Sequence, residues 1–96
     1  MKAYVVLNSR VVDPVLLDEY RAGARHTISK HGGMVLAGNN DATVLEGDPA
    51  GTRVVIVEFP SREAAMAWYD DPEYAGPKAQ RLKATAGVTL LVDGRA

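Results

Sequence analysis

Two short segments of this sequence are apolar on both faces of a strand, and this feature limits the fold more than any other. Residues 3–7 (AYVVL) and residues 54–57 (VVIV) show no alternation between apolar and polar side chains. Strands of this kind lie in the centre of a sheet and bury both faces. A chain of 96 residues, which we expect to form a single domain over residues 1–96, has few segments with which to cover them.

Helix signals alternate with these strands. Asp13 before Pro14 predicts a helix start, and Gly32-Gly33 predicts its end, with Leu17, Tyr20, Ala24, Ile28 and His31 on the buried side. Ser61 caps a second predicted helix, which Asp71-Pro72 ends or kinks before a helical tail over residues 72–84. The other predicted strands span residues 34–37, 52–59 and 88–92. The first of these is a bulged or bent edge strand that resumes over residues 42–46.

The order β-α-β-β-α-β predicts an α+β, ferredoxin-like fold. Right-handed crossovers place both helices on one face of a four-stranded antiparallel sheet in the order 4-1-3-2. The central strands are apolar on the other face too, and no segment is left to cover it. We therefore expect a second copy of the chain to pack sheet against sheet as an isologous homodimer.

Composition excludes several classes of partner and cofactor. A net charge of −1 gives no basic surface for nucleic acid, and the absence of cysteine rules out thiolate ligands. Two histidines without acidic residues at ligand spacing predict no metal site, and no cofactor-binding motif occurs. The longest apolar run, residues 64–69, has six residues and is too short to span a membrane. The apolar run near the start of the chain is too short for the core of a signal peptide, so we expect a cytoplasmic protein.

Several short motifs occur together in a characteristic order. They are Gly32-Gly33, Leu45-Glu46-Gly47, Glu58-Phe59-Pro60-Ser61, Ala64-Ala65, Trp68-Tyr69, Asp71-Pro72-Glu73-Tyr74 and Arg81-Leu82. From about Tyr4 to Gly94, the chain resembles the uncharacterised bacterial family known as domain of unknown function thirteen-thirty, of the dimeric α/β-barrel superfamily. Family members often have an arginine after the second strand, whereas this chain has Ala37-Gly38-Asn39-Asn40.

The resemblance implies a ferredoxin-like subunit, a barrel-like dimer and a small-molecule cleft between sheet and helices. Superfamily relatives include cofactor-free monooxygenases of polyketide metabolism, muconolactone isomerases and haem-degrading enzymes. One fold hosts many reactions, so the resemblance does not assign one.

Glu58 is the leading catalytic candidate. On a central strand between Val57 and Phe59, a partly desolvated carboxylate could act as a general base. Arg81 is its expected counterpart, because a guanidinium can bind a carboxylate of the protein or of a ligand. The structural alternatives are an ion pair that holds Glu58 at the strand end and a surface position for Arg81.

His31 is a third catalytic candidate, as a proton shuttle. The structural alternative is that His31 interacts with the negative C-terminal end of its own helix. His26 is expected to face solvent. The aromatic residues Tyr20, Trp68, Tyr69 and Tyr74 are candidates for a ligand pocket, although core and dimer packing also explains them. Three functions stay open: a cofactor-independent enzyme acting on a small aromatic or carbonyl-bearing metabolite, a non-catalytic ligand-binding dimer, and a structural or accessory subunit with a filled cleft.

Overall fold

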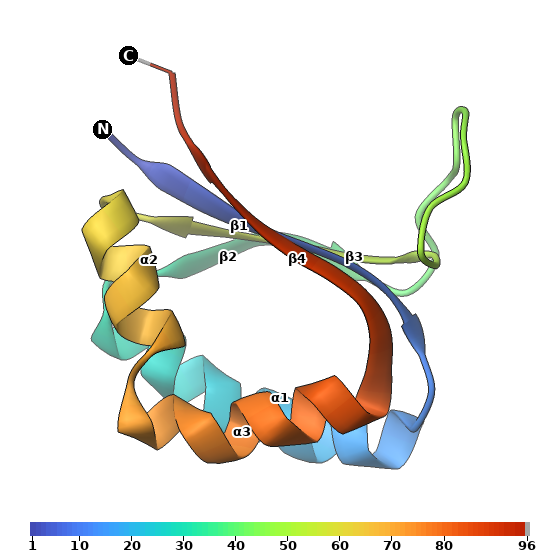
Figure 1. The fold of residues 1–96 in the computed structure, drawn as a ribbon, viewed down its shortest axis with the longest axis horizontal. Helices are drawn as coiled ribbons and strands as arrows, with labels where there is room; N and C mark the ends of the chain where they lie inside the picture. The colour runs from blue at the N-terminus through green and yellow to red at the C-terminus, as the bar shows by residue number, and fades with distance from the viewer. Residues whose placement is uncertain (96) are drawn as a thin grey trace.

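A computed structural model describes residues 1–95 and confirms the expected order of elements. The elements are β1 (Ala3–Val11), α1 (Pro14–Lys30), β2 (Met34–Asn39), β3 (Arg53–Phe59), α2 (Arg62–Tyr69), α3 (Pro72–Ala84) and β4 (Thr85–Asp93). The strands form one sheet in the order β2-β3-β1-β4, and neighbouring strands are antiparallel. All three helices lie on one side of this sheet, as Figure 1 shows. The fold is ferredoxin-like, as the sequence predicted.

The helix boundaries follow the predicted signals. The side chain of Asp13 accepts a hydrogen bond from the Leu16 N–H, and Ser61 Oγ accepts one from the Ala64 N–H. These bonds satisfy N–H groups that have no partner within the first turn of a helix. After α1, Gly32 adopts a positive φ of 75°, a conformation that a side chain would disfavour.

Three strand predictions were wrong in extent. The first strand continues beyond residues 3–7 to Val11. Residues 42–46 form no strand; they belong to the long loop between β2 and β3, which projects beyond the side of the sheet away from the helices (Figure 1). The bulge in β2 lies earlier than expected, between Val35 and Ala37. The last strand begins at Thr85, directly after α3, because residues 85–87 already pair with β1.

The core lies between the sheet and the helices. Odd-numbered residues of β1 and β3 face the helices, and most of them, such as Leu7 and Val57, are buried. Trp68 of α2 packs on Phe59 of β3 and on Tyr74 of α3, with ring centroids 5.3 and 4.3 Å apart. Aromatic contacts therefore join α2 to both the sheet and α3.

The opposite face of the sheet is apolar and open. Val88, Leu90 and Val92 of β4 are 52–59% exposed and pair across the sheet with even-numbered residues of β1. No segment within residues 1–95 covers this face, as the sequence led us to expect.

Candidate functional site

A cavity of about 540 Å³ lies between α1 and the β2–β3 side of the sheet. It is open because the helices leave β2 uncovered: Val35 pairs with the buried Val57 and shares its face, yet Val35 is 53% exposed. We call it the larger cavity, and its apolar lining consists of Leu7, Ala24, Ile28, Val35, Val55, Val57 and Trp68. Exposed polar residues, Arg21, Arg25, Asn39 and Asn40, also line it. A cavity of this size and lining is typical of a small-molecule site.

Arg53, the first residue of β3, brings a buried charge to the wall of the larger cavity. The residue is only 5% exposed, and its Nε and Nη1 atoms have no hydrogen-bond partner in the protein. Burial lowers the pKa of the Arg53 guanidinium, and the nearby positive charges of Arg21 and Arg81 lower it further, while the phenols of Tyr20 and Tyr74 act in the opposite direction. An arginine nonetheless keeps its charge in a protein.

A smaller cavity of about 200 Å³ lies beside the first, toward β4 and α3. Leu7 and Arg53 line both cavities. Ser9, directly opposite Arg53 on the neighbouring strand, and Arg81 of α3 also line the smaller cavity. Ser9 Oγ and Arg81 Nη2 are buried without a hydrogen-bond partner. Together with the two Arg53 atoms, they are the buried side-chain polar atoms of residues 1–95 that lack a partner.

A chain of hydrogen bonds connects Arg81 to the larger cavity. Arg81 Nε donates to the Tyr74 hydroxyl at 3.3 Å, and the Tyr74 and Tyr20 hydroxyls lie 3.0 Å apart. Burial, and then Tyr74, raises the pKa of Tyr20 above its ordinary value, so the phenol stays protonated. Burial also opposes the charge of Arg81, but the phenol groups outweigh this and raise its pKa. Tyr20 therefore offers the larger cavity a neutral hydroxyl beside a buried cation.

Glu58 does not lie in this site, and the expected contact between Glu58 and Arg81 was wrong. Glu58 is an even-numbered residue of β3 and points to the open face of the sheet, where Tyr4 Oη donates to it at 3.1 Å and Lys2 Nζ lies 3.3 Å away. Arg81 lies on the helix-facing side, where it donates to Tyr74 and Thr89. It is buried, so the alternative of a surface arginine was also wrong.

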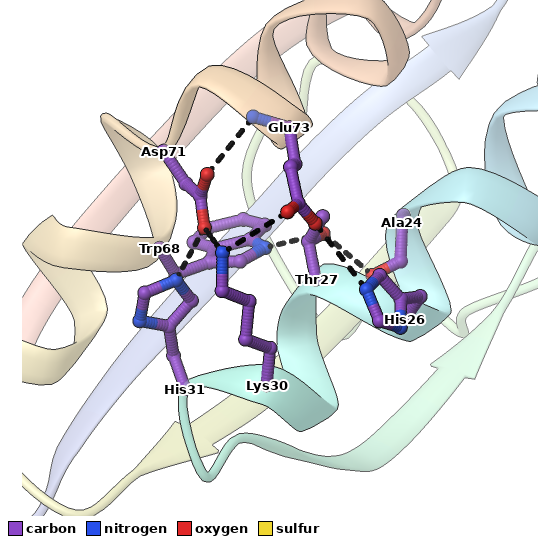
Figure 2. Close-up of polar contacts among 8 residues, drawn as sticks. All are labelled: Ala24, His26, Thr27, Lys30, His31, Trp68, Asp71 and Glu73. Carbon is purple, nitrogen blue, oxygen red and sulfur yellow. Dashed lines mark hydrogen bonds and ion pairs between the residues drawn. The ribbon is translucent and has the colours of Figure 1, made fainter.

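His31 also lies outside both cavities. It is the C-cap residue of α1, and its Nε2 lies 2.7 Å from Asp71 Oδ2 in the polar cluster of Figure 2. Lys30 Nζ donates to the same carboxylate oxygen, and the Asp71 side chain also accepts from the Glu73 N–H as the N-cap of α3. The hydrogen bond from Lys30 has the largest effect, and together with the bonds from His31 and the Glu73 N–H it holds the pKa of Asp71 well below its usual range. These contacts give His31 and the cluster a structural role, in which the imidazole joins the end of α1 to the start of α3.

The aromatic candidates divide between the cavities and the core. Tyr20 and Trp68 line the larger cavity and Tyr69 lines the smaller one. Tyr74 is fully buried and reaches the site only through the hydroxyl of Tyr20. Trp68 also has a structural bond, since its Nε1 donates to Thr27 Oγ1, as drawn in Figure 2.

Sequence reasoning missed Arg53 and Ser9. The signal was available: Arg53 is two residues before Val55 and four before Val57, and Ser9 is two residues after Leu7. Alternation along a strand places both on the helix-facing side.

Within residues 1–95, no group of three or more His, Cys, Asp or Glu residues is arranged to hold a metal ion. No helix in the same range has the length and apolar character needed to cross a membrane.

Comparison with known proteins shows the family. Residues 2–95 match the family described as Domain of unknown function (DUF1330). Among proteins of curated function, none is significantly similar in sequence to this chain.

Solved structures share the fold. A protein of unknown function from Rhodopseudomonas palustris has a TM-score of 0.79 at 18% identity, over 99% of this chain and 83% of that chain. A dimeric protein of unknown function and ferredoxin-like fold from Bacteroides fragilis has a TM-score of 0.60 at 11% identity, over 97% of this chain and 95% of that chain. A Nitrosomonas europaea protein described as "Putative antibiotic biosynthesis monooxygenase" has a TM-score of 0.53 at 13% identity, over 96% and 89% of the two chains. At such identities the likeness extends to the fold alone. Since the family model spans nearly the whole sequence, the chain belongs to the DUF1330 family.

Proposed function

We propose that this protein is a small-molecule-handling homodimer whose ligand, a small aromatic or carbonyl-bearing metabolite, occupies the larger cavity. The observation that carries the proposal is the cavity itself: about 540 Å³, apolar on most of its walls and lined also by Tyr20 and Arg53. Ligand sites of globular proteins have this combination of volume, apolar lining and few convergent polar groups. A structural subunit with a filled cleft is disfavoured because the cavity is open.

Ligand binding can be tested by titrating a fragment library into the ¹⁵N-labelled protein. We expect chemical-shift changes at cavity residues such as Val35, Val55 and Ile28. A tryptophan at position 35 would occupy the mouth of the cavity, so V35W should abolish these changes. The matched control is V15W, because Val15 is 69% exposed on α1 and does not line the cavity. Shift changes that survive in V35W, or that never occur at cavity residues, would contradict the proposal.

Catalysis without a cofactor is the second candidate function. Arg53 and the protonated hydroxyl of Tyr20 line one cavity, where they would stabilise negative charge that develops on a carbonyl oxygen. The description of the Nitrosomonas europaea protein is consistent with this candidate. Of the residues in 1–95 that line the larger cavity, none is Asp, Glu or His. A proton would therefore pass to solvent or to a group on a second copy, and this gap favours binding over catalysis.

Glu58 keeps a possible role only at the open face. Its hydrogen bond from Tyr4 and its ion pair with Lys2 place a carboxylate where a second copy would pack. Turnover of a candidate substrate by E58Q at the wild-type rate would remove Glu58 from the reaction.

The homodimer is supported by the open apolar face and by the β2–β3 loop. Leu45 in this loop is 92% exposed, and the loop projects on the same side as the open face (Figure 1). The Bacteroides fragilis neighbour is itself described as dimeric. We expect sedimentation equilibrium to give a dimer for the wild type and a folded monomer, or an aggregate, for L90R. V15R on the helix side is the control and should stay dimeric. A folded wild-type monomer at micromolar concentration would refute the dimer.

A further inference from the structure

We propose that the ligand is an organic anion with an apolar body, in the first place a carboxylate, and that Arg53 binds its charged group. This inference rests on the proposed small-molecule function, because it names the chemical class that the same cavity would select.

The first argument is the missing partner of Arg53. A buried guanidinium is normally paired, because an unpaired buried charge is strongly destabilising. Arg53 is 95% removed from solvent, given its 5% exposure, and two of its nitrogen donors bind nothing in the protein. A ligand anion in the cavity that Arg53 lines would supply the counter-charge that the described residues do not.

The second argument is the sign of the charges around Arg53. Neither cavity is lined by an Asp or Glu among the described residues, whereas Arg21 and Arg25 line the larger cavity and Arg81 lines the smaller one. Among residues 1–95, the carboxylate that these arginines bind is that of Asp18, which pairs with Arg21 on the exposed side of α1. The surroundings therefore have excess positive charge, which attracts an anion and repels a cation.

The third argument is that the unpartnered polar atoms lie together. Ser9 and Arg53 are directly opposite each other on β1 and β3, and both line the smaller cavity with Arg81. Ser9 Oγ and Arg81 Nη2 lack partners, as the Arg53 atoms do. A carboxylate has two oxygens that can accept about four hydrogen bonds, which suits a set of donors from several side chains.

The walls of the larger cavity define the rest of the ligand. Ile28, Val35 and Val57 give this cavity apolar walls, which suit a ligand with an apolar body. Trp68 adds an aromatic surface to the same wall. We therefore infer an organic anion with an aliphatic or aromatic body.

The test compares carboxylates with their neutral isosteres. Benzoate, 3-phenylpropanoate and hexanoate are titrated in parallel with benzamide, 3-phenylpropanamide and hexanamide, with the dissociation constant measured by ¹⁵N chemical shifts in 0.15 M sodium chloride. The same spectra follow the Arg53 Nε–Hε signal, assigned by its loss in R53M. We expect at least one carboxylate to bind at least tenfold more tightly than its amide and to shift the Arg53 signal.

Two variants connect this preference to Arg53. R53M keeps a long apolar side chain and should reduce carboxylate binding at least tenfold while leaving amide binding within about threefold. R10M is the control, because Arg10 is exposed on β1 and lines neither cavity. It should change neither constant, which separates a specific contact from the general effect of one positive charge. If R53M does not fold, R53K, which also lacks the Nε–Hε group, assigns the Arg53 signal. The wild-type comparison of acid with amide then decides the question.

The outcomes separate this inference from the proposed function. Carboxylates and amides that bind equally at cavity residues, or a carboxylate preference that R53M retains, would overturn the anion inference and leave the small-molecule function standing. No binding of any acid or amide at cavity residues, together with failure of the fragment library there, would overturn both.

Discussion

Replacing Arg53 by methionine should make the unliganded protein more stable. The guanidinium is buried with two donors unpaired, so the folded state bears a desolvation penalty that the unfolded state does not. Methionine retains the apolar stem of the side chain and removes the charge. Replacing a buried ion pair by apolar residues of similar volume is often neutral or stabilises by about 1 to 4 kcal/mol, and Arg53 lacks even the compensating partner of such a pair.

A domain of this length gains roughly 4 to 8 °C in Tm for each 1 kcal/mol. The expected result for R53M is therefore a rise of at least about 4 °C, measured by thermal unfolding at fixed protein concentration, with chloride as the only added anion. The concentration must be fixed because association would also shift the Tm.

Arg81→Met is the matched control, since Arg81 is equally buried but has partners. Its Nε and Nη1 donate to the Tyr74 hydroxyl and Thr89 Oγ1, so its removal takes away two hydrogen bonds. Loss of hydrogen bonds to a charged group costs about 1.5 to 3 kcal/mol each, against which the removed desolvation penalty acts. We expect R81M to lower the Tm or leave it unchanged. A fall in the Tm of R53M as large as that of R81M would show that Arg53 is structurally satisfied, and it would refute the reasoning behind the anion site.

The remaining predictions concern other parts of the molecule. Glu58→Gln and Arg81→Met should have additive effects on the free energy of unfolding, within about 0.5 kcal/mol, because the two residues share no partner and lie on opposite sides of the sheet. Urea unfolding of both single variants and of the double variant measures this, and a larger coupling energy would show that the two residues interact. Asp71→Asn should lower the Tm at pH 7, because bonds from the end of α1 lower the pKa of Asp71 below its ordinary value of 3.8. A carboxyl group with a lowered pKa stabilises the fold at pH values above its unfolded-state pKa, and this stabilisation is lost as the pH falls toward its folded-state pKa. The difference in Tm between wild type and D71N should therefore shrink below about pH 4. A difference that grew there would contradict the assignment. Gly23→Val should destabilise, since a Cβ at Gly23 would lie 2.7 Å from Pro77 Cγ where α1 meets α3; an unchanged Tm would mean that the two helices can move apart freely.

Local signals predicted most of the fold because each acts within a few residues. Asp13, Ser61 and Gly32 mark helix ends through bonds and angles that depend on their neighbours alone. The start of β4 was harder, since residues 85–87 become a strand only through their pairing with β1. The absence of a strand at residues 42–46 has the same origin, because strand structure depends on an available partner as well as on β propensity.

The candidate site was predicted less well than the fold, for a reason that strand geometry makes clear. Glu58 was expected in the cleft because it is flanked by Val57 and Phe59, which bury against the helices. Successive side chains of a strand point to opposite faces, so burial of these neighbours sends Glu58 to the other face. The same rule puts Arg53 in phase with Val57 and predicts its burial. The rule cannot predict whether a carboxylate from a distant segment pairs with Arg53, because that depends on the packing of the helices.

The alternation also separates the two proposed roles of the sheet. In β1 and β3 the odd-numbered residues, Ser9 and Arg53 among them, face the cavities, and the even-numbered residues, such as Val6 and Ile56, face the surface on which a second copy would pack. A one-residue slip of register would exchange these faces, placing Arg53 in the dimer interface and Glu58 under the helices. The apolar stretches of β1 and β3 are alike on both faces and so do not by themselves choose between these registers. The register matters most for the polar residues at the strand ends, where it keeps a buried cation on the ligand side. It follows that substitutions at odd positions should change ligand binding at constant oligomeric state, and substitutions at even positions should change association first.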